Sequence, residues 1–242
     1  MSEWFLDWFN HDYLQLYAQR NAQEAALQVS FILKHVQLPL EATILDLGCG
    51  AGRHAIEMAS RGFHVVGVDS STILIQQAIK IKRDHPNWDL TFLNQDLFAL
   101  DLGHRFDLVM NMFTSFGYFA EDEKNAEIFK VVAKHLKKNG KFLFDYLNPK
   151  YAIEHLVPSE KVELKEKTVQ ITRKVENDKR IIKTIQFPHK TYQEKVSLYS
   201  RDQIEEMMQS YGLYPIKVWN NFEGEEWSEG GERQIFLCAL KS

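Results

Sequence analysis

The spacing of hydrophobic positions changes along this chain near residue 40. Aromatic and aliphatic side chains recur every three or four residues over 3–18 and again over 20–37, which predicts two helices at the start. The second pattern stops before Pro39, and proline cannot continue a helix. Beyond that point short, nearly continuous apolar runs appear, as in buried parallel strands.

These apolar runs alternate with helical patterns from residue 43 to residue 147. The predicted strands are 43–47, 63–68, 90–93, 106–110 and 141–147. One helix follows a glycine-rich turn and runs to about residue 60, and a second begins at the N-cap candidates Ser70 and Ser71. A third covers 121–138 and is expected to close at Asn139-Gly140. Such alternation predicts a mainly parallel sheet with helices on both faces.

The alternation breaks after residue 149. Residues 160–199 are rich in β-branched residues that alternate with charges, and Asn177-Asp178 is a turn signal, so two to four antiparallel strands are expected. A helix over 201–211, capped by Ser200, and two strands at 214–221 and 234–240 then follow. The strand pair is close in sequence and is predicted to be antiparallel. Residues 1–149 and 200–242 are therefore expected to form one domain, and 150–199 an inserted antiparallel β subdomain.

Composition and charge narrow the functional classes. The chain has 242 residues, of which 45% are hydrophobic and 26% charged, which argues against a disordered protein. The net charge of −4 argues against a surface built to hold long nucleic acids. Cys49 and Cys238 lie in no paired motif, and no His or Cys spacing implies a metal.

The N-terminal residues, the apolar stretches and the cysteines predict a cytoplasmic location. The first ten residues are aromatic and acidic, unlike a signal peptide, and no apolar stretch is long enough to span a membrane. The two unpaired cysteines fit a reducing compartment. A monomer and a homodimer both remain open.

Candidate chemistry is concentrated after the first strand, in Asp46-Leu47-Gly48-Cys49-Gly50-Ala51-Gly52-Arg53. Glycines let the chain turn sharply and let a ligand lie against the main chain. The helix that follows offers free N–H groups and a positive dipole end, so an anionic group fits there.

Two ligand classes compete for such a loop. A dinucleotide loop requires G-x-G-x-x-G, but the third position here is Arg53 rather than glycine. Asp46, two residues before Gly48, would repel a pyrophosphate but attract an ammonium. S-adenosylmethionine carries an ammonium and a carboxylate and no phosphate, so these residues favour it over a nicotinamide dinucleotide.

Two further acids follow the next strands. Asp69 ends the second strand, 19 residues after Gly50, where an acid binds ribose hydroxyls in nucleoside-binding α/β folds. Asp96 follows the third strand, where its carboxylate is suited to accept a hydrogen bond from the adenine amino group while Leu97 donates its backbone N–H.

In this order the motifs resemble those of class I S-adenosylmethionine-dependent methyltransferases, over about 40–148 and again over 200–240. The resemblance implies a Rossmann-like, doubly wound sheet of seven strands, mostly parallel with an antiparallel last strand. It also implies that S-adenosylmethionine is bound and S-adenosylhomocysteine released. The residues expected around this cofactor are Tyr13, Tyr17, Asp46, Gly48, Cys49, Gly50, Arg53, Asp69, Ser70, Gln95, Asp96, Leu97, Asn111 and Phe113.

The stretch 111–119, after the fourth strand, resembles a subgroup that methylates small molecules, including aminosugars. That subgroup also has a tyrosine-bearing N-terminal helix over the cofactor and a β insertion after the fifth strand. The stretch lacks the two prolines of nucleobase N-methyltransferases. Because the ends of strands four and five flank the methyl site in this fold, the expected acceptor-side residues are Ser115, Tyr118, Tyr146 and Asn148.

The predicted function is methyl transfer to nitrogen or oxygen of a small molecule. An RNA or protein methyltransferase and a non-catalytic S-adenosylmethionine-binding protein are the alternatives. No catalytic base is identified. Residues 150–199 are expected to roof the acceptor pocket, so that their deletion leaves cofactor affinity largely intact.

Overall fold

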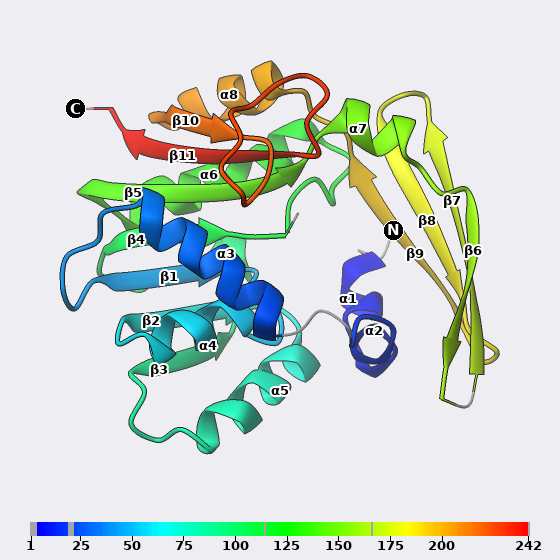
Figure 1. The fold of residues 1–242 in the computed structure, drawn as a ribbon, viewed down its shortest axis with the longest axis horizontal. Coiled ribbons are helices and arrows are strands. Elements are labelled where there is room, and N and C mark those ends of the chain that lie inside the picture. Colours follow the sequence, from blue (N-terminus) through cyan, green and yellow to red (C-terminus); the bar gives the residue numbers. More distant parts are fainter. Residues whose placement is uncertain (1–3, 19–21, 114, 166, 242) are drawn as a thin grey trace.

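The protein is described by a computed structural model over residues 4–18, 22–113, 115–165 and 167–241. Some predicted positions lie outside these ranges: residues 3, 20 and 21 of the two predicted N-terminal helices, and Thr114 of the 111–119 stretch. The main sheet has seven strands in the order β10-β11-β5-β4-β1-β2-β3, and a separate sheet has the order β6-β7-β8-β9 (Figure 1). The predicted fold class is confirmed.

The main sheet is parallel except at β11, which runs antiparallel to both β5 and β10. Its strands are β1 Thr43–Leu47, β2 His64–Asp69, β3 Leu90–Asn94, β4 Phe106–Asn111, β5 Leu136–Leu147, β10 Leu213–Trp219 and β11 Arg233–Leu240. Because β1, β2 and β4 are neighbours and parallel, their carboxyl ends meet at one edge. Loops with candidate chemistry are therefore brought together there.

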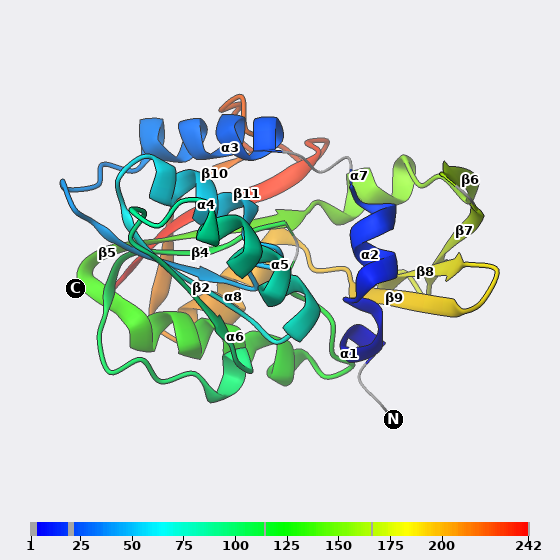
Figure 2. The same ribbon diagram turned by 90° about the horizontal axis from the view of Figure 1, so that it is seen from below.

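Helices cover both faces of this sheet, as its apolar strands require. Helices α6 and α8 share one hydrophobic core with the sheet, and α3 and α4 share the core on the other face (Figure 2). The helices of this domain are α3 Ala22–His35, α4 Arg53–Ser60, α5 Thr72–Arg83, the short 3-10 helix η1 Leu97–Ala99, α6 Asp122–His135 and α8 Arg201–Gln209. No helix within the described ranges has the length and apolar character needed to cross a bilayer.

The second sheet, here called the inserted sheet, follows helix α7 (Pro149–Glu154). Its strands are β6 Ser159–Leu164, β7 Lys167–Glu176, β8 Arg180–Gln186 and β9 Thr191–Ser197, all antiparallel. Asn177 and Asp178 turn β7 into β8 with positive φ of 51° and 53°, in a loop closed by a hydrogen bond from the Lys179 N–H to the Glu176 carbonyl at 3.0 Å. The predicted upper limit of four strands is confirmed.

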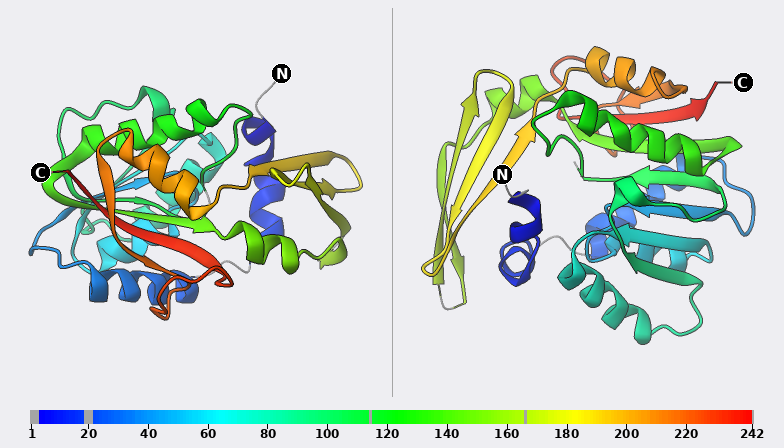
Figure 3. Two further views of the ribbon diagram at one scale, coloured as in Figure 1. Left: turned by 90° about the horizontal axis from the view of Figure 1, so that it is seen from above. Right: turned by 180° about the vertical axis from the view of Figure 1, so that it is seen from behind.

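The N-terminal segment forms two short helices, α1 (Trp4–Trp8) and α2 (His11–Leu16), so the prediction of one continuous helix is wrong. Asn10 lies between them in extended conformation and its side chain accepts the backbone N–H groups of Asp12 and Tyr13, which starts a new helix. Residues 4–17, here called the N-terminal cover, lie between the two sheets (Figure 3).

The predicted end of the α6 helix at Asn139-Gly140 is also wrong. Helix α6 stops at His135, Leu136 is extended, and Asn139 and Gly140 lie inside β5. A Cβ at Gly140 would lie 2.9 Å from the Phe106 carbonyl oxygen of β4. Glycine is therefore explained here by the close approach of two strands rather than by a helix terminus.

Candidate functional site

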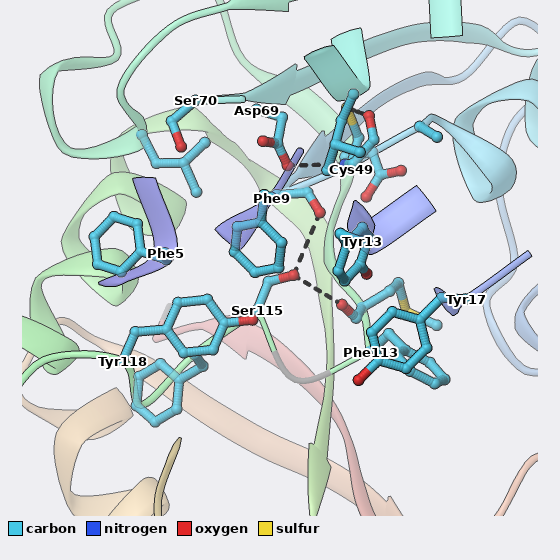
Figure 4. Close-up of a pocket in the computed structure, with 18 of the residues that line it drawn as sticks. Phe5, Phe9, Tyr13, Tyr17, Cys49, Asp69, Ser70, Phe113, Ser115 and Tyr118 are labelled. Atoms are coloured by element: carbon cyan, nitrogen blue, oxygen red, sulfur yellow. Dashed lines mark hydrogen bonds between the residues drawn. The ribbon is translucent and has the colours of Figure 1, made fainter. Parts of the chain in front are cut away.

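A cavity of about 1260 Å³ opens at the carboxyl edge of the main sheet. Its wall comes from the loops after β1, β2, β3 and β4, from the N-terminal cover and from strand β9 of the inserted sheet. Helices α4, α5 and α6 and the start of β11 also contribute side chains. Figure 4 shows Asp69 and Ser70 on one side, Ser115 and Tyr118 on the other, and aromatic rings of the N-terminal cover around them.

The glycine loop between β1 and α4 is tightly fixed. Gly48 has a φ of 71°, and a Cβ there would lie 2.8 Å from Cβ of Ser115. The Gly48 and Cys49 N–H groups both donate to the Val68 carbonyl, at 2.8 and 3.1 Å. Gly48, Cys49 and Gly50 all line the cavity, so the main chain is exposed to a ligand without a side chain in between.

Asp69, at the end of β2, holds this loop in place. Its two carboxylate oxygens accept the backbone N–H groups of Gly50 and Ser71, each at 2.8 Å. Burial raises the pKa of Asp69, and the two backbone hydrogen bonds oppose that rise. Each carboxylate oxygen has capacity for a second donor, so the side chain can also accept hydroxyl groups from a ligand in the cavity.

Asp46, near the end of β1, lines the cavity and is 1% exposed. Its Oδ2 accepts no hydrogen bond from any residue that the structure describes. Burial, followed by the nearby Asp69 carboxylate, raises the pKa of Asp46 to about 7. A buried carboxylate oxygen without a donor is costly unless a cation or a proton satisfies it.

Arg53 begins α4 and lines the cavity. Its Nη1 donates to Glu24 at 2.6 Å, and its guanidinium lies 4.6 Å from the centre of the Phe113 ring. Its Nη2 is buried and finds no acceptor among the described residues. A carboxylate placed in the cavity would satisfy this donor.

Phe113, after β4, is held in an unusual backbone conformation with φ of 61°. Its N–H donates at 2.9 Å to Asp145, which is fully buried on β5 and also accepts a hydrogen bond from Arg233 Nε. The Arg233 guanidinium lies 5.5 Å from the Phe113 ring. The loop after β4 is thus tied to β5 and β11, where the cost of the conformation is offset.

Aromatic side chains of the N-terminal cover close the cavity from the side opposite the main sheet. Tyr13 packs on Phe9 and on Tyr17, with ring centroids 5.0 and 4.8 Å apart, and Trp4 packs on Tyr118 at 4.9 Å. All five rings line the cavity. Such rings exclude water and can attract a positively charged ligand group.

Three predicted residues that follow β2 and β3 lie on the cavity wall: Ser70, Asp96 and Leu97. Asp96 caps η1 by accepting the Phe98 N–H at 3.0 Å. Gln95 is half-buried, donates its N–H to the Asp69 carbonyl at 3.1 Å, and is not part of the described cavity wall.

On the acceptor side, Ser115 and Tyr118 line the cavity as predicted. The Ser115 hydroxyl lies 3.3 Å from the Gly48 carbonyl and 3.2 Å from the Met112 carbonyl. Asn111 is fully buried behind the wall, where its Nδ2 donates to the Leu47 carbonyl at 2.8 Å. Asn111 therefore joins β4 to β1 rather than lining the described cavity.

Tyr146 and Asn148 are not brought to the described cavity wall. Tyr146 is fully buried, and its hydroxyl donates to the Ser197 carbonyl. Asn148 caps α7 and donates to the Glu229 and Gly231 carbonyls, at 3.0 and 2.7 Å. Tyr146 thus joins β5 to the end of β9 in the inserted sheet, and Asn148 joins the start of α7 to the loop before β11.

The cavity wall also carries charged residues that were not among the predicted site residues, among them Glu194 and Arg233. Glu194 lies on the same face of β9 as Tyr192 and Val196, so a charge occupies the apolar side of that strand. This position can be recognised in the sequence from the spacing of two residues. Arg233 starts the last strand and carried no comparable signal.

Comparisons with known proteins agree with this arrangement. Residues 44–140 match a family model described as a methyltransferase domain. YqeM of Bacillus subtilis strain 168, which bears a methyltransferase name, is 36% identical over 110 residues, 45% of this chain and 43% of that protein. The chain is thus aligned to less than half the length of the curated relatives that it matches.

Two solved structures extend the likeness to nearly the whole chain. An S-adenosylmethionine-dependent methyltransferase from Clostridium acetobutylicum ATCC 824 superposes with a TM-score of 0.79 at 19% identity, covering 96% of this chain and 97% of that one. CalS10 from Micromonospora echinaspora, an amino pentose methyltransferase with S-adenosylmethionine bound, has a TM-score of 0.67 at 20% identity over 96% and 97%. Residues 44–140 thus match a methyltransferase domain, and over nearly its whole length the chain has the fold of S-adenosylmethionine-dependent methyltransferases.

Proposed function

We propose that this protein transfers a methyl group from S-adenosylmethionine to a nitrogen or oxygen atom of a small molecule. One observation carries the proposal. The cavity joins the glycine loop, the Asp69 carboxylate and the unpartnered Asp46 oxygen. The two carboxylates would repel a pyrophosphate. They suit a ligand in which an amino acid is linked to a nucleoside.

The chain's own polar groups match the cofactor's functional groups. Asp46 is suited to the ammonium, the buried Nη2 of Arg53 to the carboxylate, and Asp69 to the ribose hydroxyls. Asp96 and Leu97 are suited to the adenine. When bound, the cofactor supplies a methyl group already activated by a sulfonium.

The enclosure of the cavity supports a small acceptor. Ligand pockets commonly measure roughly 300–1,000 Å³, so a cavity of about 1260 Å³ has room for a cofactor and a second small molecule. The protein's main contribution is then to align the acceptor with the methyl group. CalS10, whose fold this chain shares, acts on an amino pentose, which agrees with a small acceptor.

We assign the two predicted domains different tasks in this proposal. Residues 1–149 and 200–242 supply the cofactor loops, and residues 150–199 supply the wall of the acceptor side through Glu194 and Val196. Ser115 and Tyr118 are the acceptor-side residues from the main sheet. Arg233, tied to Asp145, completes that side at the start of β11.

The test is calorimetric titration with S-adenosylmethionine and S-adenosylhomocysteine, on the wild type and on Asp69→Ala. We expect saturable binding by the wild type and weaker binding by the variant, followed by methyl transfer to a fraction of a metabolite extract. A well-folded wild type that binds neither compound would refute the proposal, and dinucleotides would then be titrated.

A further inference from the structure

The N-terminal cover shares its hydrophobic core with the inserted sheet rather than with the main sheet. Trp8 and Leu16 are buried in a cluster whose other fully buried members all belong to or follow β7, β8 and β9: Val169, Ile171, Ile185, Phe187 and Tyr192. The cover and the inserted sheet therefore bury their apolar surface together, and neither keeps that core alone.

Strand β9 binds the beginning of α2. The Tyr192 hydroxyl donates to Asp12 Oδ2 at 2.9 Å and accepts from Asn10 Nδ2 at 3.1 Å. Asn10 is the residue that caps α2, and Asp12 lies in its first turn. The start of the helix that carries Tyr13 is thus fixed by a side chain of the inserted sheet.

Two residues further along the same strand, Glu194 binds the other end of α2. Its Oε1 accepts Trp8 Nε1 at 2.6 Å and the Tyr17 hydroxyl at 3.0 Å. Lys183 of β8 lies 3.5 Å from Glu194 Oε2 and also contacts the Tyr17 hydroxyl. The position of the Tyr17 ring in the cavity therefore depends on charges carried by the inserted sheet.

Asp12 adds a second ionic attachment. It is 9% exposed and pairs with Lys167 Nζ at 3.1 Å and with His189 Nε2 at 2.7 Å. Burial acts to raise the pKa of Asp12, but hydrogen bonds from Tyr192, Lys167 and His189 together hold it below its usual value. Paired and mostly buried, this carboxylate fixes the helix more firmly than an exposed ion pair does.

The N-terminal cover contacts the main domain through hydrogen bonds to backbone carbonyls and through aromatic packing. The Ser71 hydroxyl donates to the Phe9 carbonyl at 2.6 Å, and Trp4 Nε1 donates to the Tyr118 carbonyl at 3.3 Å. Both bonds are accepted by backbone carbonyls, and Trp4, Phe5 and Phe9 also pack on Tyr118 and Phe5 on Phe119. Within the described ranges, the side-chain hydrogen bonds and ion pairs of Asp12 in α2 go to residues between β7 and β9.

We propose that Asp12 and Glu194 are positioning residues, through which the inserted sheet sets Tyr13 and Tyr17 in the cofactor cavity. The inference rests on the proposed function, since it takes the cavity to bind S-adenosylmethionine. It alters the expected division of labour, because removing residues 150–199 would also release the tyrosines of the N-terminal cover. Cofactor affinity then depends on the insertion.

Calorimetric titration with S-adenosylhomocysteine tests this in the full chain. We expect Asp12→Asn and Glu194→Gln each to weaken binding about tenfold, the effect of losing one charge-assisted contact. Glu163→Gln is the matched control, because Glu163 is an exposed carboxylate of the same sheet that contacts Thr168. The control is expected to bind like the wild type.

A double variant separates positioning from general destabilisation. Because Glu194 acts through the Tyr17 hydroxyl, Glu194→Gln combined with Tyr17→Phe is expected to cost little more than Tyr17→Phe alone. Additive losses, or unchanged affinity in Asp12→Asn and Glu194→Gln, would overturn the proposal. A wild type that binds no S-adenosylhomocysteine would instead refute the proposed function, so the two failures are distinct.

Discussion

Asp46, the last residue but one of β1, and Asp69, the last residue of β2, lie on neighbouring strands, and only the Asp69 carboxylate has a hydrogen bond to each oxygen from the described residues. Asp69 accepts two backbone N–H groups at 2.8 Å, whereas Asp46 Oδ2 accepts none from the described residues. The negative charge of Asp69 is one of the causes that raise the pKa of Asp46. The unsatisfied member of the pair is thus poised to exchange a proton for a cationic ligand group.

This exchange predicts a pH-dependent cofactor affinity. With a pKa of about 7, Asp46 is largely protonated at lower pH and must lose its proton to attract an ammonium. We expect S-adenosylhomocysteine to bind about tenfold more tightly at pH 8 than at pH 6. Calorimetry in buffers of different ionisation enthalpy is expected to detect proton release below pH 7. Asp46→Asn should bind weakly with no such dependence, and an equally steep dependence in that variant would assign the titration elsewhere.

Gly48 offers a test of the loop that is independent of charge. Gly48→Ala is expected to lose about 1–3 kcal/mol of unfolding free energy, because it combines positive φ with a clash against Ser115. Gly62→Ala isolates the first cause, since Gly62 has φ of 92° and a Cβ added there would meet no atom within 4 Å. Urea denaturation is expected to show the larger loss for Gly48→Ala, partly restored by adding Ser115→Gly. Equal losses at the two glycines would exclude the clash.

The sequence was sufficient to bring most of the predicted cofactor residues to the cavity wall, because those of the main sheet are local to strand ends. Asp46, Gly48 and Gly50 form one short motif, and Asp69 ends the next strand. In a parallel sheet the carboxyl ends of neighbouring strands lie at the same edge, independently of the rest of the chain. The mainly parallel pairing of the sheet follows from the same alternation of strands and helices.

The acceptor side depends on side-chain direction, which the sequence did not reveal. Successive residues of a strand point to opposite faces. On β5, Asp145 faces Phe113 and Arg233, while Tyr146 faces the core shared with α6 and α8. A one-residue difference thus places Asp145, rather than the predicted Tyr146, against two residues of the cavity wall, Phe113 and Arg233. Glu194 was missed because its partners Trp8 and Tyr17 are far away in sequence.

Removal of the Tyr146 hydroxyl is expected to lower stability, whereas removal of the Tyr118 hydroxyl is expected to lower turnover. Tyr146→Phe removes a buried hydroxyl and leaves the Ser197 carbonyl without its donor, so about 1–3 kcal/mol of unfolding free energy should be lost with little change in KM. Tyr118→Phe keeps the ring that packs on Trp4 but changes the cavity wall, so turnover rather than stability should fall. Urea denaturation and steady-state kinetics with an identified acceptor compare them. Lost turnover with intact stability in Tyr146→Phe would reverse the assignment.

His54 is expected to make stability depend on pH. It is 4% exposed, its Nε2 lies 2.6 Å from Gln28 Oε1, and burial, with Arg53 as the second cause, lowers its pKa to about 3. Because the unfolded chain binds a proton at this side chain near pH 6.5 and the native state does not, the stabilisation is complete above that pH. It is lost as pH falls, at about 1.4 kcal/mol per pH unit.

Asp46 acts with the opposite sign in part of the same window, since its pKa is raised to about 7 and its stabilising effect is lost as pH rises. The two contributions are separated by variants. We expect His54→Asn to flatten the fall in unfolding free energy between pH 6.5 and pH 4, and Asp46→Asn to steepen it. His85→Asn, at an exposed histidine stacked on Trp88, serves as the control and should follow the wild type. Parallel curves for His54→Asn and the wild type would show that His54 is protonated alike in the native and unfolded states.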